Sequence, residues 1–225
     1  MIPIRIALLG DSWGVPNYFG GTGAAHYHHI EWLLKYNDNH VVTNFSKNGG
    51  SNLETLERLN YAFEIDYKTD LVIWVHTEPI RDTNIEQVKE YKLQELSEDK
   101  ARSSYKFAQQ VKYKSGCKWL VIGGQAPINK QVFDQYHIAD FVKYDWRSEL
   151  ADKTLPETPV LARTEFLESP KWVDTDDMKH KWVEIHHEVQ WELSRCEMFP
   201  DNAHPGAEAH HILYEWIHQT VLQNI

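Results

Sequence analysis

The sequence contains little cysteine, no long apolar run and a deficit of positive charge. Its only cysteines are Cys117 and Cys196, too few for the disulfide framework of a small secreted protein. We therefore expect two free, buried thiols in a reducing compartment. No apolar run reaches the roughly 20 residues of a membrane-spanning helix. Ile2–Leu9 is apolar but lacks the basic leader and cleavage site of a signal peptide, so we expect neither a transmembrane segment nor a signal peptide.

The charge balance is acidic. A net charge of -10 results from 23 Lys+Arg against 33 Asp+Glu. Such a surface repels nucleic-acid phosphates and anionic membranes, so we expect neither as a partner. The 225 residues, 42% of them hydrophobic, suffice for one α/β domain with a core, and we expect a single domain over residues 1–225.

Strand-like and helix-like segments alternate along the chain. Because parallel strands need crossover connections, this alternation predicts a parallel sheet with helices on both faces. The fold class is thus a three-layer α/β/α sandwich, flavodoxin-like, with about five strands. The expected strands are Ile4–Leu9, Val41–Phe45, Leu71–Val75, Trp119–Ile122 and either Phe141–Tyr144 or Val160–Ala162. The expected helices are Thr22–Tyr36, Asn52–Phe63, about Thr83–Lys114, Asp176–Cys196 and Ala207–Leu222. Residues from about 125 to 175 are rich in proline and aromatics and are expected to form a long loop or cap.

A serine follows the first expected strand, in Gly10-Asp11-Ser12-Trp13-Gly14. In open α/β sheets, ligands bind beyond the carboxyl ends of the strands, where Ser12 can present both its hydroxyl and its N–H. Alone, such a serine is more often a turn or cap residue. The motif also matches the Gly-x-Ser-x-Gly elbow of α/β-hydrolases, but that fold needs earlier strands, for which this chain has no room.

A carboxylate precedes a histidine by three positions in Asp201-Asn202-Ala203-His204-Pro205-Gly206, just before the last expected helix. Asp201 can accept a hydrogen bond from Nδ1–H of His204, which leaves Nε2 free to take a proton from a serine. The alternative is that Asp201 caps the helix and His204 lies on the surface.

A glycine-containing loop follows the second expected strand, in Asn44-Phe45-Ser46-Lys47-Asn48-Gly49-Gly50-Ser51-Asn52. Glycine lets a backbone N–H approach a ligand and donate to a developing oxyanion. The alternative is a plain turn whose following helix is capped by Ser51 or Asn52.

Together these three motifs resemble the SGNH/GDSL hydrolase family, in order and spacing, from residue 4 to about 220. The family's Gly-Asp-Ser block matches the motif around Ser12. Its block-two glycine matches Gly49, with Gly50 as the alternative, and its Asp-x-x-His block matches Asp201 and His204. The resemblance implies Ser12, Asp201 and His204 as catalytic residues, with the N–H groups of Ser12 and Gly49 forming the oxyanion hole. It implies no cofactor and no metal.

The third block departs from the family pattern, which is Gly-x-Asn-Asp with the Asn as an oxyanion donor. Here the third strand continues into His76-Thr77-Glu78-Pro79, with Glu78 at the Asn position. A carboxylate would repel an oxyanion, so we expect Glu78 to point elsewhere or to bind a substrate hydroxyl. Thr77, His76 or Asn52 can supply the missing hydrogen bond. Losing one such donor typically lowers the rate by about 10²–10³.

The resemblance implies a serine esterase or acylhydrolase that cleaves small acyl esters, often acetyl esters on carbohydrates, through an acyl-enzyme. Trp13, next to the nucleophile in the chain, is expected to line the substrate pocket together with His76 and Glu78; the alternative for Trp13 is packing against the following helix. Glu78 also leaves open a second class: a catalytically weak carbohydrate-binding or structural module, such as a phage virion component. The expected location is cytoplasmic or virion-associated. A flavodoxin-like nucleotide binder is disfavoured, because Asp11 and the acidic balance do not suit a phosphate loop.

The other histidine clusters predict no metal site. His26-Tyr27-His28-His29 has suitable spacing, but no carboxylate or cysteine cluster completes it. In the His186-His187 and His210-His211 pairs, we expect one member to face solvent.

Overall fold

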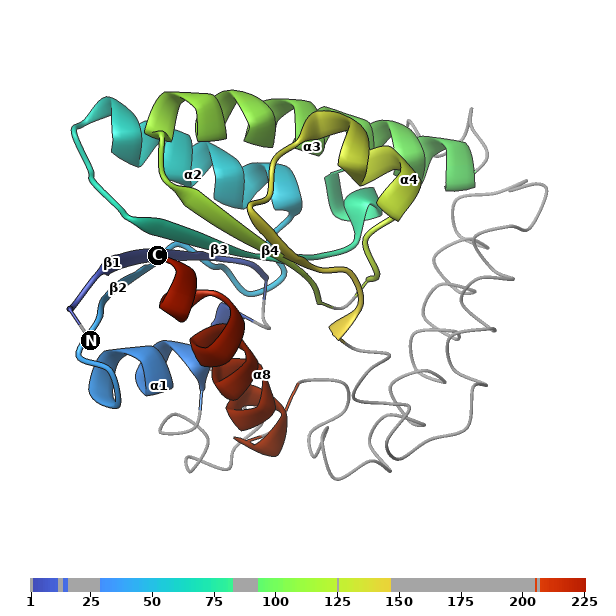
Figure 1. Ribbon diagram of the computed structural model, residues 1–225. Helices are drawn as coiled ribbons and strands as arrows, with labels where there is room; N and C mark the ends of the chain where they lie inside the picture. The colour runs from blue at the N-terminus through green and yellow to red at the C-terminus, as the bar shows by residue number, and fades with distance from the viewer. Residues whose placement is uncertain are drawn as a thin grey trace.

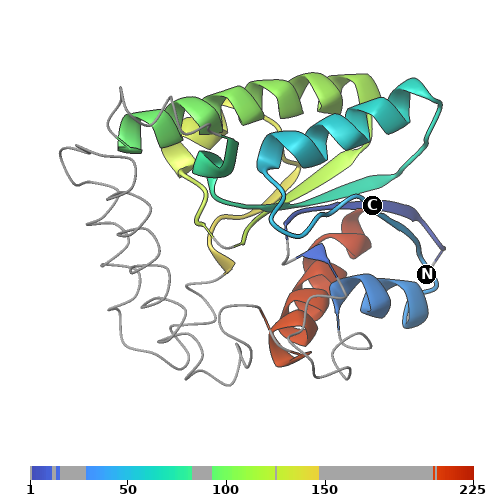
Figure 2. The same ribbon diagram turned by 180° about the vertical axis from the view of Figure 1, so that it is seen from behind.

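The computed structural model describes residues 2–11, 14–15, 29–82, 93–124, 126–146, 205 and 207–225. Its elements form three layers (Figure 1). Helices α2 (Asn52–Glu64), α3 (Leu93–Ser115) and α4 (Lys130–Phe133) cover one face of the sheet. Helices α1 (Ile30–Tyr36) and α8 (Ala207–Thr220) cover the other, as the view from behind also shows (Figure 2). The predicted α/β/α sandwich is confirmed.

The sheet has five parallel strands in the order β2-β1-β3-β4-β5. They are β1 (Arg5–Leu9), β2 (Val41–Asn44), β3 (Leu71–His76), β4 (Lys118–Gly123) and β5 (Phe141–Lys143). Of the two candidate fifth strands, the one at Phe141 forms, and Val160–Ala162 lies outside the described residues. Because all five strands are parallel, their carboxyl ends share one edge of the sheet.

The side chains of β3 alternate between two cores. Ile73 and Val75 pack with α1 and α8 on one face, whereas Val72 and Trp74 pack with α2 and α3 on the other. All six residues of β3 are buried, as expected for the central strand of a sheet covered on both faces. This alternation also decides the direction of His76, which shares the face of Trp74.

Helix α1 begins later in the sequence than predicted. His29 has extended backbone angles and accepts a hydrogen bond from Glu31 N through Nδ1, so it caps α1 and the helix starts at Ile30. The expected start at Thr22 falls in residues 16–28, outside the described residues.

The remaining helices agree with expectation where they are described. A short 3₁₀ turn, η3 (Pro79–Asp82), precedes α3, and residues 83–92 lie outside the described residues. Helix α8 is followed by a 3₁₀ turn, η6 (Leu222–Asn224). The expected helix Asp176–Cys196 also lies outside. None of the described helices combines the length and apolarity needed to cross a bilayer.

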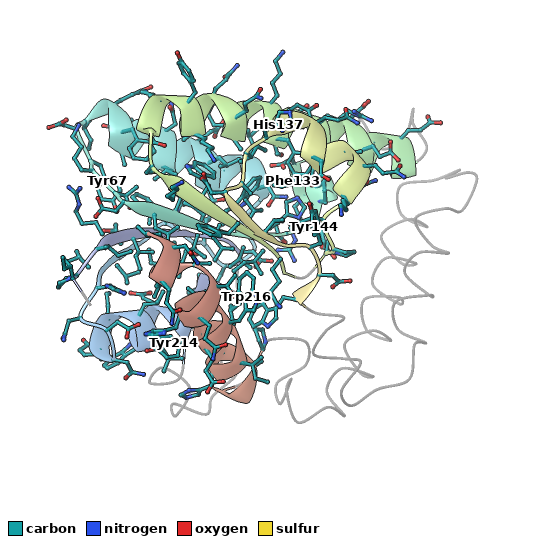
Figure 3. All side chains as sticks on the ribbon, viewed as in Figure 1. Tyr67, Phe133, His137, Tyr144, Tyr214 and Trp216 are labelled. Carbon is teal, nitrogen blue, oxygen red and sulfur yellow. The ribbon has the colours of Figure 1, made fainter. Side chains whose placement is uncertain are left out.

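Residues 126–146 hold α4, the 3₁₀ turn η5 (Asp134–Tyr136) and β5. Phe133 and Tyr144 pack edge to face, 6.4 Å apart, beside the last strand (Figure 3). The rest of the expected cap, from residue 147 on, lies outside the described residues. Cys117 is a free, half-buried thiol whose pKa is raised by burial, and Cys196 lies outside.

Candidate active site

Backbone hydrogen bonds hold the described residues that precede and follow Ser12 in the chain. Gly14 N donates to the carbonyl of Asp11 at 3.0 Å, and Lys47 N donates to the carbonyl of Gly10 at 3.0 Å. Ser12 and Trp13 lie between them in the chain and outside the described residues. The described residues on either side of Ser12 in the chain are therefore held close to the carboxyl end of β1.

Asn44, the last residue of β2, secures Gly14. Its Nδ2 donates to the carbonyl of Gly14 and to Oε2 of Glu31, both at 2.7 Å, and its Oδ1 accepts from Ser46 N at 2.8 Å. A Cβ on Gly14 would collide with the side chain of Ser46. The close approach of the loop after β2 therefore requires glycine at this position.

Asp11 is anchored to the segment after β3. Its carboxylate is buried, and Oδ2 accepts from Oγ1 of Thr77 at 2.7 Å. Nη1 of Arg81 lies 3.5 Å from the same oxygen, and Nε of Arg81 donates to Oε2 of Glu78 at 3.2 Å. The residues of the third block thus hold the residue beside the candidate nucleophile.

Thr77 has both of its donors engaged within the protein. Its N–H donates to Oδ1 of Asn52 at 2.9 Å and its hydroxyl donates to Asp11. The expectation that Thr77 supplies an oxyanion hydrogen bond is therefore wrong. Nδ2 of Asn52 donates to the carbonyl of Thr77 at 2.8 Å, and because a primary amide has two hydrogens, Asn52 stays a predicted donor.

His76 faces the core, not the carboxyl edge. Its Nε2 lies 3.2 Å from the hydroxyl of Tyr105, and its ring packs at 5.5 Å from that of Trp74. Burial lowers the pKa of His76 to about 3, so the ring is neutral near pH 7. The expectation that His76 binds substrate or the oxyanion is wrong.

The side chain of Glu78 is only 4% exposed and is paired with Arg81. Both expectations for Glu78 stay predictions. Arg81 was not among the residues expected at the site. Its spacing of three residues from Glu78 was the available signal, since such pairs lie on the same side of a 3₁₀ turn.

The two glycines after β2 differ in what their N–H groups do. Gly49 has a left-handed φ of +64° and is exposed, and among the described residues nothing accepts its N–H. Gly50 N donates to the carbonyl of Lys47 at 2.8 Å, so it is not available to an oxyanion. Oγ of Ser51 caps α2 by accepting from Glu54 N, which makes the loop a capped turn with Gly49 as its remaining candidate donor.

The last helix begins at the same edge of the sheet. His210, in its first turns, is fully buried and its ring lies 4.4 Å from that of His29, which caps α1, and 5.7 Å from that of Trp146, just beyond β5. Further along α8, the hydroxyl of Tyr214 donates to Asp38, beyond the other end of α1 (Figure 3). Helices α1 and α8 therefore run in the same direction, away from the carboxyl edge.

This direction places the first residues of α8 at the carboxyl edge of the sheet, where β1 also ends. Pro205 is described and buried, two positions before α8. Asp201 and His204 precede it in the chain and lie outside the described residues. Among the described residues, no group of three or more His, Cys, Asp or Glu side chains is arranged to hold a metal ion.

The fold of the chain resembles that of a solved esterase. The structure of the psychrotrophic esterase EstA from Pseudoalteromonas sp. shares 13% sequence identity, covers 97% of each chain and superposes with a TM-score of 0.50. The two chains therefore share a three-layer α/β/α fold. At this identity the likeness shows the fold alone.

Two further solved structures superpose with lower TM-scores. TesA shares 16% identity over 98% of this chain and 99% of its own, with a TM-score of 0.45. A candidate SGNH hydrolase from Slackia heliotrinireducens shares 13% identity over 95% of this chain and 98% of its own, with a TM-score of 0.43. No family model and no curated protein matches the sequence.

Proposed function

We propose that this protein is a serine esterase or acylhydrolase in which Ser12 is the nucleophile and His204, oriented by Asp201, is its general base. The observation that carries the proposal is an unbroken series of contacts from the serine turn to the start of α8. Gly14 accepts from Asn44, which also donates to Glu31. Glu31 N donates to His29, whose ring packs on His210.

These contacts support a common position for the two motifs. His210 is only six residues from His204 in the chain, and Gly14 only two from Ser12. A triad needs residues from distant parts of the chain to converge at one end of the sheet. The described neighbours of both motifs lie at the carboxyl edge, as that geometry requires.

The proposed reaction follows from these roles. Oγ of Ser12 attacks the ester carbonyl while Nε2 of His204 takes its proton, and Asp201 stabilises the imidazolium. The N–H groups of Ser12 and Gly49 donate to the oxyanion. His204 then protonates the leaving alcohol, and a water that His204 deprotonates releases the acid from the acyl-Ser12 intermediate. Small acyl esters, with acetyl esters on carbohydrates foremost, are the proposed substrates, and no cofactor takes part.

Turnover of p-nitrophenyl acetate by the wild-type protein and by Ser12→Ala tests the proposal. Ser103→Ala is the matched control, because Ser103 is an exposed hydroxyl on α3 that donates only along its own helix. We expect loss of turnover in Ser12→Ala alone. A phosphonate probe, chosen because EstA was solved inhibited by monoethylphosphonate, should label Ser12, and labelling at another residue would contradict the assignment. A screen of acetylated sugars then identifies the alcohol.

A second candidate is a catalytically weak carbohydrate-binding or structural module, for example in a phage virion. The observation that favours it is that Thr77 and Glu78 offer no hydrogen-bond donor to an oxyanion. Equal turnover by the wild-type protein and Ser12→Ala, together with binding of an unesterified sugar, would favour this module over the esterase.

A further inference from the structure

One guanidinium, that of Arg81, contacts two buried carboxylates, one of which belongs to Asp11, the residue that precedes the candidate nucleophile in the chain. We propose that Arg81 is a positioning residue of this site: it holds Asp11 in place and offsets its charge, and Glu78 serves to orient Arg81. The inference rests on the proposed esterase function and deepens it. It also gives a role to the one block of the sequence that departs from the family pattern.

The geometry carries the assignment. Nη1 of Arg81 lies 3.5 Å from Oδ2 of Asp11, and Nε of Arg81 donates to Oε2 of Glu78 at 3.2 Å. The side chains of Asp11 and Glu78 are 1% and 4% exposed, and that of Arg81 is 22% exposed. A planar guanidinium has donors pointing in several fixed directions, so it can serve two carboxylates at once where a lysine ammonium matches less well.

The local backbone fixes Arg81 in this position. Arg81 N donates to the carbonyl of Glu78 at 3.1 Å within η3. The next residue, Asp82, accepts from Leu53 N of α2 at 3.2 Å and from Oγ of Ser104 of α3 at 3.2 Å. The turn that carries Arg81 is therefore attached to two helices, which limits how far its side chain can move.

Charge explains why the site needs this residue. Burying an ionised carboxylate is costly unless its charge is offset, and the negative charge of two such groups would oppose formation of an oxyanion at the proposed site. Arg81 reduces the summed charge of the three groups from −2 to −1. Asp11 is bonded directly to Ser12, so a shift of its carboxylate would move the turn that presents the nucleophile.

The test is a comparison of kcat and KM on p-nitrophenyl acetate for the wild-type protein, Arg81→Gln, Arg81→Lys and Glu78→Gln/Arg81→Gln. The control is Arg58→Gln, since Arg58 is an exposed arginine that also pairs with a glutamate, on α2. We expect Arg81→Gln to lower kcat at least tenfold with KM changed less than twofold. Arg81→Lys should recover part of the lost kcat. The double variant should have a higher kcat than Arg81→Gln, because Glu78→Gln removes one buried negative charge.

Active-site titration with a phosphonate probe expresses each kcat per competent site, so misfolding of a variant does not count as loss of positioning. A kcat per site in Arg81→Gln equal to that of Arg58→Gln overturns the inference and leaves the esterase intact. So does a double variant slower than Arg81→Gln. Absence of Ser12-dependent turnover in the wild-type protein overturns the proposed function and, with it, this role of Arg81.

Discussion

The imidazole of His210 lies 4.4 Å from that of His29, so the first turns of the last helix pack directly on the cap of the first described helix. The two residues are 181 positions apart in the chain. Because α1 begins at the carboxyl edge of the sheet, this contact places the start of α8 there as well. The convergence that we propose for the two catalytic motifs depends on it.

Asn44 links the serine turn to α1, and we expect Asn44→Asp to break that link. The change removes two donated hydrogen bonds, to Gly14 and Glu31, and sets a second carboxylate beside Glu31. Buried polar groups that lose a partner cost about 1–3 kcal/mol each, so chemical denaturation should show a loss of about 3 kcal/mol with a parallel fall in turnover. The control is Asn60→Asp, because Asn60 also donates to a glutamate but at an exposed site on α2. Equal losses in the two variants would contradict the special role of Asn44.

Gly14→Ala should distort the turn around Ser12. The added Cβ would meet the side chain of Ser46, and overpacking of this kind costs about 1–3 kcal/mol. We expect slower labelling of Ser12 by a phosphonate. The double variant Gly14→Ala/Ser46→Gly removes the obstructing side chain and should recover most of the labelling rate. If the second change brings no recovery, the collision is not the reason for glycine here.

Buried neutral histidines should make the protein sensitive to acid. Burial lowers the pKa of His76 from 6.5 to about 3, and burial also lowers the pKa values of His40 and His210. A base whose folded pKa is lowered binds its proton more readily in the unfolded chain. Stability is therefore complete above about pH 6.5 and falls as the pH drops below it, by at most about 1.4 kcal/mol per pH unit for each such histidine.

Urea unfolding of the wild-type protein and His76→Gln between pH 7.5 and 4.5 measures this contribution. We expect a shallower pH slope in His76→Gln than in the wild-type protein. His137→Asn is the control, since His137 is exposed and has a left-handed φ that asparagine accepts. An unchanged slope in His76→Gln would mean that His76 takes up no extra proton on unfolding.

The sheet could be predicted because its strands are short apolar runs that end in glycine or polar residues. The position of the fifth strand could not be predicted, because Phe141–Tyr144 and Val160–Ala162 are similarly apolar. The pairing of β5 with β4, which local sequence does not reveal, identifies the first of them as a strand. The start of α1 was missed because the cap is His29, a residue type with no strong capping preference.

The site was predictable in its motifs but not in its contacts. Strand alternation puts His76 on the face of Trp74 only because β3 extends one residue beyond the expected end at Val75. The pairing of Arg81 with Asp11 joins residues 70 positions apart, and local patterns carry no information on such contacts. Thr77 looked like a free donor because its partners, Asn52 and Asp11, come from other segments.

A crystal structure of the protein after reaction with a phosphonate ester tests the convergence of the two motifs most directly. The account predicts phosphorus bonded to Oγ of Ser12, with Nε2 of His204 within about 3 Å of the ester oxygens and Asp201 on its other nitrogen. An adduct on another residue, or a His204 imidazole at the amino ends of the strands, would contradict it.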